Sequence, residues 1–165
     1  MRELQNLLNV SYATVNRGIR WLAANEYVNL KGGKEKTIVL NLEGRALWEK
    51  AKTQMTSPIE FTAHTPELWL GEKGLISGEN ALAEYTMYNG GPYRVALYKK
   101  VYEVIKKDVF WDPYAEAAIE VWKYDPKLLS DTGTADKFSL YLLLRDNPDD
   151  RVQIELENMI NEIQW

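Results

Sequence analysis

The chain has 165 residues, of which 45% are hydrophobic and 27% are charged, a composition typical of one large or two small globular domains. It contains no cysteine and a single histidine, which excludes a disulfide framework, a cysteine nucleophile and most zinc sites. The longest apolar runs are too short to cross a bilayer, and Arg2-Glu3 follow Met1 in place of the apolar core of a signal peptide. We therefore expect a cytoplasmic protein with no membrane association.

The net charge of -4 conceals an asymmetry between the two ends of the chain. Residues 1–56 hold nine Lys or Arg against five Asp or Glu, a net charge of +4, whereas the remainder carries -8. A basic module joined to an acidic one is typical of a protein whose first part meets a polyanion and whose second part has another task. We therefore expect two domains, at 1–56 and 65–165, joined by a linker at 57–64.

Two short helices are predicted at the start of the chain. The first covers residues 2–8, because three leucines follow the i, i+3, i+4 spacing of one helix face: Leu4, Leu7 and Leu8. Ser11 can cap the second helix, over residues 12–25, since its hydroxyl can accept from amides two or three residues further on. Three apolar residues follow at helical spacing: Val15, Ile19 and Leu22. Because the core of residues 1–56 is small, the inward residues of both helices are expected to need cover from the 43–54 helix, the other domain or a second chain: Leu4, Leu8, Val15, Ile19 and Leu22.

The segment YVNLKGGKEKTIVLNL, residues 27–42, contains two β-rich runs around Gly32-Gly33. A glycine pair between such runs predicts a hairpin with a tight turn. A third helix is expected over residues 43–54. Residues 57–64 then form a linker or a connecting strand, because prolines on either side limit regular structure.

The second module is predicted to mix helices and strands. Ser77 is expected to cap a helix with four inward residues: Ala81, Leu82, Tyr85 and Met87. YRVALY and AAIEVWKY are typical of strands, and KKVYEVIKKD between them is a short helix or a further strand. Asp136 can cap a helix over DKFSLYLLL, and Asn147 can cap the last helix, DNPDDRVQIELENMINEIQW. The whole chain therefore belongs to the α+β class.

The stretch VSYATVNRGIRWLAANEYV resembles the recognition helix of a winged helix-turn-helix domain of the MarR-like kind. The small residue Ala13 and Thr14-Val15 stand where such helices begin, and Tyr27-Val28 leads directly into the wing. The resemblance covers Arg2 to about Gln54, and the first helix of the family's three-helix core is expected to be missing. It implies a bacterial transcription regulator with an N-terminal DNA-binding domain.

Three segments of the second half resemble the C-terminal region of bacterial winged-helix regulators of the AbiE-type antitoxin kind: SGENALAEYTMYN, EVWKYDPKLLS and SLYLLLRDNPDDRVQIELENMI. Such proteins join a DNA-binding wing to an α/β domain. The resemblance implies that residues 65–165 form an effector, dimerisation or partner-binding domain. Its partner would be a toxin-like protein or a small-molecule effector.

Polar side chains occupy the second helix away from its apolar positions, and they are the candidate DNA contacts: Ser11, Tyr12, Thr14, Asn16, Arg17 and Arg20. An α-helix fits the major groove of double-stranded DNA, and its N-terminal residues reach base edges. Arg17 can pair with guanine and Asn16 with adenine, each good pair contributing roughly 1 to 3 kcal/mol of discrimination. Tyr12 and Thr14 can contact phosphate or a thymine methyl group.

Three lysines surround the predicted hairpin turn: Lys31, Lys34 and Lys36. They would meet backbone phosphate or the minor groove and add affinity with little sequence information. For any one of these side chains, a solvated polar face is an equally good interpretation. The combination of turn, helix and basic wing is more specific than any member.

No catalytic residue, metal ligand or cofactor site is predicted. Glu120 and Lys123 suggest a nuclease, but residues three apart on a strand point to opposite faces, so Glu120 is expected to be a solvated strand residue. Helix capping explains Asp146, Asp149 and Asp150 better than metal binding does. The aromatic residues of the second half are interpreted as core, and His64 as a surface or linker residue.

The sequence thus predicts a DNA-binding transcription regulator, a repressor or autoregulator that acts as a homodimer on double-stranded DNA. Two alternatives stay open. The winged helix can serve as a scaffold for protein contacts without binding DNA, or the protein can be an antitoxin that acts mainly on a partner protein. The lone histidine and the absence of cysteine disfavour an enzyme in residues 65–165.

Overall fold

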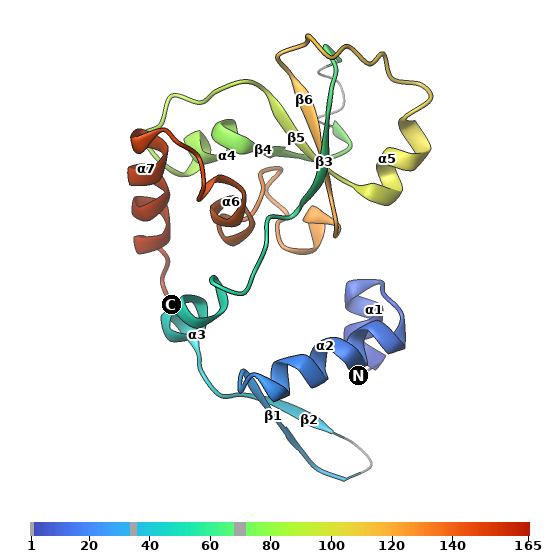
Figure 1. Ribbon diagram of the computed structural model, residues 1–165, viewed down its shortest axis with the longest axis vertical. Helices are drawn as coiled ribbons and strands as arrows, with labels where there is room; N and C mark the ends of the chain where they lie inside the picture. Colours follow the sequence, from blue (N-terminus) through green and yellow to red (C-terminus); the bar gives the residue numbers. More distant parts are fainter. Residues whose placement is uncertain (1, 34–35, 68–71) are drawn as a thin grey trace. The chain divides into compact units, whose positions relative to one another are not determined.

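The computed structural model describes residues 2–33, 36–67 and 72–165, and the chain divides into two compact units. The first unit comprises Met1–Met55 with Trp165, and the second comprises Thr56–Gln164. Helices accompany two separate sheets, one in each unit, which places the protein in the α+β class (Figure 1). Among the described residues, no helix combines the length and the apolar character needed to span a membrane.

The described residues of the first unit form α1 (Arg2–Leu8), α2 (Tyr12–Ala24), a hairpin of β1 (Val28–Lys31) and β2 (Thr37–Leu40), and α3 (Gly44–Ala51). The two strands pair antiparallel, with Val28 opposite Leu40 and Lys31 opposite Thr37. The predicted hairpin is confirmed and Gly32 has a positive φ of 97°, but Lys31 pairs with Thr37, so the strands are not joined by a two-residue turn at Gly32-Gly33. The third helix ends at Ala51, three residues before its predicted end.

The core of the first unit is small. Its buried apolar side chains come from α2, the start of the hairpin and α3: Val15, Ile19, Tyr27, Val28 and Trp48. Every residue of α1 is described and none is buried, so the described part of the first unit does not supply the cover that Leu4 and Leu8 were expected to need. Leu7 is 64% exposed and Leu8 is 44% exposed. Apolar spacing predicts that a helix forms, but it does not say what will cover the apolar side.

The second unit is built on a four-stranded sheet in the order β3-β6-β5-β4. Its strands are β3 (Ile59–His64), β4 (Leu75–Ser77), β5 (Arg94–Tyr98) and β6 (Ala118–Trp122). The central strands β5 and β6 are parallel, and the two outer pairs are antiparallel. Of the two alternatives for residues 57–64, the strand is confirmed and the linker is wrong, because most of these residues belong to β3. An edge strand tolerates the neighbouring prolines, whose missing N–H groups would weaken a central strand.

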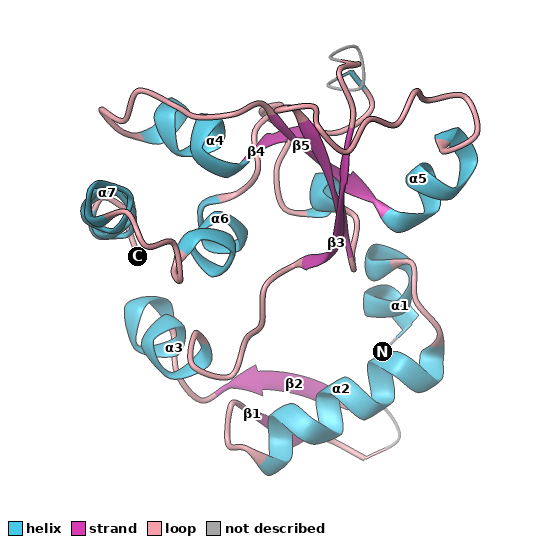
Figure 2. Cartoon of the chain, turned by 45° about the horizontal axis from the view of Figure 1, so that its top comes forward, coloured by secondary structure: helices cyan, strands magenta, loops and turns pink. Residues whose placement is uncertain are grey.

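The helices of the second unit whose bounds lie within the described residues are α4 (Gly78–Tyr85), α5 (Lys99–Ile105), η2 (Pro126–Leu128), α6 (Lys137–Leu144) and α7 (Asp150–Asn161). The segment KKVYEVIKKD, left open between helix and strand, contains α5. Two parallel strands need a crossover connection, and α5 lies in the connection between β5 and β6. Figure 2 shows α5 on one side of the sheet and α4, α6 and α7 on the other.

Helices cover both faces of the sheet, and the central strands β5 and β6 direct apolar side chains into both layers. Val95 and Ile119 pack with residues of α5 and the segment after it. Trp122 lies on the opposite face, where its ring meets the ring of Tyr124 at 5.6 Å between centroids. The Tyr124 hydroxyl in turn hydrogen-bonds Ser139 of α6 at 2.6 Å. The second unit therefore has apolar layers on both sides of β5 and β6.

The helices α6 and α7 both begin at a side-chain cap, and one of the two predicted cap residues is wrong. The Asp136 carboxylate accepts hydrogen bonds from the amides of Phe138 and Ser139, so the predicted cap of α6 is confirmed. Asp149, rather than Asn147, is the N-cap of α7, because the carboxylate of Asp149 accepts from the Arg151 amide at 2.8 Å. Asn147 forms the turn before it, since its side-chain oxygen accepts from the Asp149 amide.

The fourth helix also differs from the prediction. It ends at Tyr85, so Met87 lies beyond it and is 86% exposed instead of inward. Ser77 occupies the N-cap position, but its hydroxyl makes no capping hydrogen bond. Ala81 and Leu82 are fully buried, as their spacing predicts.

Candidate nucleic-acid interface

A short turn separates α1 from α2 and fixes where α2 begins. Asn9 adopts a positive φ of 49°, a conformation that asparagine tolerates better than most residues. Ser11 is the N-cap, and its hydroxyl accepts from the Thr14 amide at 3.1 Å. The Ser11 and Thr14 hydroxyls also share a hydrogen bond of 2.9 Å. Both predicted DNA contacts thus serve in the capping of α2, although both residues are exposed.

The side of α2 that faces away from the core is positive. Val15 and Ile19 are buried, whereas Arg17 and Arg20 are exposed and stand three residues apart, which brings them to one face of the helix. Tyr12 is 52% exposed at the first turn. Between Tyr12 and Ala24 the sequence has no Asp or Glu. The exposed side of α2 therefore carries two positive charges and no negative charge, together with the exposed rings of Tyr12 and Trp21.

Asn16 and the hairpin lysines differ in their exposure to solvent. Asn16 is half-buried, so it lies at the side of the face that Arg17 and Arg20 present. Lys31 ends β1 and Lys36 immediately precedes β2, and both are exposed at the same end of the hairpin. Lys34 lies outside the described residues.

A side chain that the sequence did not single out holds the end of α2. The Lys50 ammonium, from α3, donates to the carbonyl oxygens of Asn25 and Glu26 at 3.0 and 3.3 Å. It also lies 4.7 Å from the centroid of the Tyr27 ring. No local pattern in the sequence could identify these contacts, because Lys50 and the carbonyls that it meets are 24 and 25 positions apart.

The second unit offers a groove of opposite charge. Its volume is about 570 Å³, and it lies between the end of α4 and the last turns of α7. The lining side chains are Glu84, Tyr85, Thr86, Met87, Glu155, Asn158, Asn161 and Glu162. Three carboxylates at this groove would repel nucleic-acid phosphate. The candidate nucleic-acid interface therefore belongs to the first unit.

Glu120 is buried on the central strand β6, so its predicted role as a solvated residue is wrong. Only 6% of the residue is exposed, and its carboxylate accepts from the Ser77 hydroxyl at 2.5 Å. Burial raises the pKa of Glu120, and the Ser77 hydrogen bond partly opposes that shift. Residues on a strand alternate between faces, but a central strand of a covered sheet has no solvated face.

The other residues weighed from the sequence have structural surroundings. His64 is half-buried in β3, where its Nδ1 atom lies 2.8 Å from the Ala115 carbonyl oxygen. The Trp111 indole donates to the Lys106 carbonyl at 2.8 Å, and Trp122 is fully buried. Trp69 lies outside the described residues. Within the described parts of the chain, His, Asp and Glu side chains form no group of three or more that could hold a metal ion.

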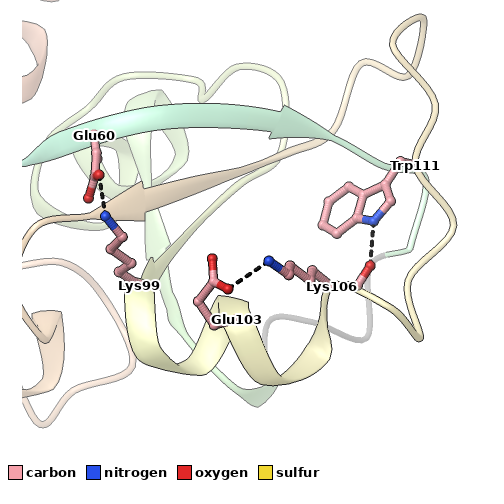
Figure 3. A network of polar contacts seen from close by, with 5 residues as sticks. All are labelled: Glu60, Lys99, Glu103, Lys106 and Trp111. Carbon is pink, nitrogen blue, oxygen red and sulfur yellow. Dashed lines mark hydrogen bonds and ion pairs between the residues drawn. The ribbon is translucent and has the colours of Figure 1, made fainter.

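Ion pairs surround α5 on the other face of the sheet (Figure 3). Lys99 pairs with Glu60 of β3, and Lys106 pairs with Glu103 at 2.6 Å. At the end of the helix, the Trp111 indole donates a hydrogen bond to the Lys106 carbonyl. The Lys99–Glu60 pair ties α5 to β3, whereas the Lys106–Glu103 pair lies along the helix itself; all four charged side chains have partners within the chain.

The geometry as a whole defines an α+β protein with a helix, turn, helix, hairpin and helix in its first unit and a mixed sheet in its second. Comparison of the chain with family models, curated proteins and solved structures finds no match. The likeness to MarR-like winged helices and AbiE-type regulators is therefore a proposal, and it rests on the residues of this chain.

Proposed function

We propose that the protein is a DNA-binding transcription regulator whose first unit is a winged helix-turn-helix domain. In this proposal α2 is the recognition helix and the β1–β2 hairpin is the wing. One observation carries it: α2 buries Val15 and Ile19 while exposing Arg17 and Arg20 on a face without acidic residues. A basic helix preceded by a short turn and followed by a hairpin with exposed lysines suits the major groove.

Arg17 is the best candidate for reading a base. It is exposed, stands in the second turn of α2 and can donate two parallel hydrogen bonds to guanine. Arg20 lies one turn further along the same face and would meet phosphate or a neighbouring base. Asn16 is half-buried beside this face, so its pairing with adenine is the weaker part of the proposal.

The hairpin would supply affinity rather than sequence preference. Lys31 and Lys36 are exposed on either side of the loop, where phosphate contacts release counterions from DNA. A single short recognition helix reads few base pairs, so we propose that two copies act on a two-fold site as a homodimer. Occupation of such a site would repress a promoter, the protein's own included.

The test begins with selection of a preferred duplex from a random pool by the full chain. Binding of the selected and a scrambled duplex is then measured at several salt concentrations. Arg17→Ala should weaken binding of the selected duplex by roughly 1 to 3 kcal/mol and leave the scrambled duplex less affected. Lys36→Ala should weaken both alike and make the salt dependence shallower by about one unit of slope.

Lys127→Ala is the control, because it removes an exposed lysine from the acidic second unit. It should change neither duplex. If the wild type enriches no sequence and binds neither duplex at low salt, the proposed function is wrong. If Arg17→Ala and Lys36→Ala lose affinity in the same uniform way, the domain binds DNA but Arg17 does not read a base.

A second function is favoured by exposed apolar side chains of the first unit. Leu7 and Leu8 of α1 are 64% and 44% exposed, and Leu40 of the hairpin is 49% exposed. Exposed apolar surface of this kind suits contact with another protein. The unit would then be a scaffold, or the protein an antitoxin that acts on a partner. Leu7→Glu should abolish such contact, whereas Arg17→Ala should leave it intact.

A further inference from the structure

Three elements of the first unit meet at the end of α2. α2 has no basic residue in its own last turn, and Lys50 of α3 supplies a cation there. Its ammonium donates to the carbonyls of Asn25 and Glu26. Terminal carbonyls lack partners within a helix, and a cation near them also interacts favourably with the negative end of the helix dipole.

The hairpin is tied to the same point from the other side. Asn41, which follows β2, donates its side-chain amide to the Glu26 carbonyl at 2.9 Å and its backbone amide to the Tyr27 carbonyl at 3.0 Å. Its side-chain oxygen accepts from Asn29 of β1 at 2.6 Å. The carbonyl of Glu26 thus receives hydrogen bonds from both α3 and the hairpin.

Backbone strain at this junction shows that the surroundings determine its geometry. Glu26 has a positive φ of 60°, which residues other than glycine seldom adopt. Tyr27 is 5% exposed, stacks on Trp21 at 5.8 Å between centroids and donates its hydroxyl to the Lys50 carbonyl at 3.2 Å. We name the contacts of Lys50, Tyr27 and Asn41 with the end of α2 the Lys50 latch.

We propose that Lys50 is a positioning residue for DNA recognition: through the latch it sets the angle between α2 and the wing, so that both reach one duplex together. This inference rests on the proposed function. Two binding elements held in a fixed relation gain affinity and register that loosely joined elements lose. The Lys50 ammonium is committed to carbonyl oxygens, so it acts on DNA through geometry rather than through contact with phosphate.

The competing explanation is that Lys50 contributes only positive charge, and the chain offers a matched control for it. Lys52 stands two residues further on and pairs with Glu49 at 2.6 Å. Lys52→Met removes the same charge from the same segment and leaves Lys50, Tyr27 and Asn41 in place. Lys50→Met keeps the aliphatic stem and good helix propensity. The acceptor of the Tyr27 hydroxyl is a backbone carbonyl, so the Lys50→Met substitution retains it.

The experiment compares full-length wild type with Lys50→Met, Lys50→Arg and Lys52→Met on the selected and scrambled duplexes. Lys50→Met should lower the ratio of the two affinities, selected over scrambled, by about tenfold. A change of this size is typical when two interacting parts of a protein are uncoupled. Lys52→Met should weaken both duplexes alike and preserve the ratio. Lys50→Arg should restore most of the ratio, because its guanidinium can still donate to both carbonyls. Thermal unfolding verifies that each variant is folded at the assay temperature.

A second arm separates positioning from a general loss of stability. Arg17→Ala should cost less in the Lys50→Met protein than in the wild type, because Arg17 is then already misplaced. If Lys50→Met does not fold, Lys50→Gln takes its place, since it is neutral and too short to meet both carbonyls. Equal losses for Lys50→Met and Lys52→Met on both duplexes would overturn the inference while leaving DNA binding intact. Failure of the wild type to bind either duplex would instead overturn the proposed function, and this inference with it.

Discussion

The hydrogen bond between Ser77 and Glu120 allows a sharp test of how the second unit is stabilised. Ser77 is fully buried and Glu120 is 6% exposed, so neither side chain can exchange its partner for water. The Ser77 hydroxyl donates to the Glu120 carboxylate at 2.5 Å across the sheet. Ser77→Ala removes the donor, Glu120→Gln keeps an acceptor but removes the charge, and the two together complete a double-mutant cycle.

The magnitude follows from the charge of the acceptor. A buried hydrogen bond to a charged group contributes about 1.5 to 3 kcal/mol, and a neutral one about 0.5 to 1.5 kcal/mol. Ser77→Ala should therefore cost more in the wild type than in Glu120→Gln, with a coupling free energy of about 1 kcal/mol when the carboxyl is ionised. The coupling should shrink as the pH falls and Glu120 takes up a proton.

The pH dependence has a definite sign. Burial raises the pKa of Glu120, so the folded chain holds this proton over a pH range in which the unfolded chain has released it. The free energy of unfolding contributed by Glu120 therefore falls as the pH rises from the ordinary range of a glutamate through the raised pKa. Glu120→Gln lacks this loss, so its stability should gain on the wild type as the pH rises.

Urea unfolding followed by tryptophan fluorescence, from acidic to weakly alkaline pH, measures all four proteins. Buried Trp122 lies on the same strand as Glu120 and reports on the second unit. Parallel stability curves for wild type and Glu120→Gln over this range would refute the reasoning about burial. An equal cost of Ser77→Ala in both backgrounds would show that the hydroxyl does not depend on the charge.

Three further predictions concern the helices and the assembly. Gly18→Ala should raise the stability of the first unit by about 0.5 to 1 kcal/mol, because a Cβ atom there would meet nothing within 4 Å and the backbone is not left-handed. Thermal unfolding measures the change, and a lower stability of the variant would show that this exposed position needs glycine. Asp136→Ala should lower the urea stability of the second unit by about 0.5 to 2 kcal/mol by removing the cap of α6, and an unchanged midpoint would contradict the cap's role. Sedimentation should find a dimer on a two-fold duplex, and a monomer both free and bound would rule out the proposed mode of binding.

Local patterns in the sequence determined much of the secondary structure. The helical spacing of Val15 and Ile19 predicted that both lie on the buried side of α2, and the capping preference of Asp136 predicted where α6 begins. The apolar runs of β5 and β6 were recognisable because a strand covered on both faces is apolar throughout. The exposed arginines of α2 could be predicted for the same reason, since a helix with one apolar side presents its other residues outward.

Only the tertiary structure decided the features that depend on residues far apart in the chain. Ser77 and Glu120 are 43 positions apart, and Lys50 meets the Asn25 carbonyl across 25 positions. A local pattern reports which side chains share a face of one helix or strand, but not which element covers that face. For this reason the burial of Glu120, the place of β3 in the sheet and the contacts of Lys50 could not be predicted. The same limit left open what covers Leu4 and Leu8, although their helix forms where the spacing indicates.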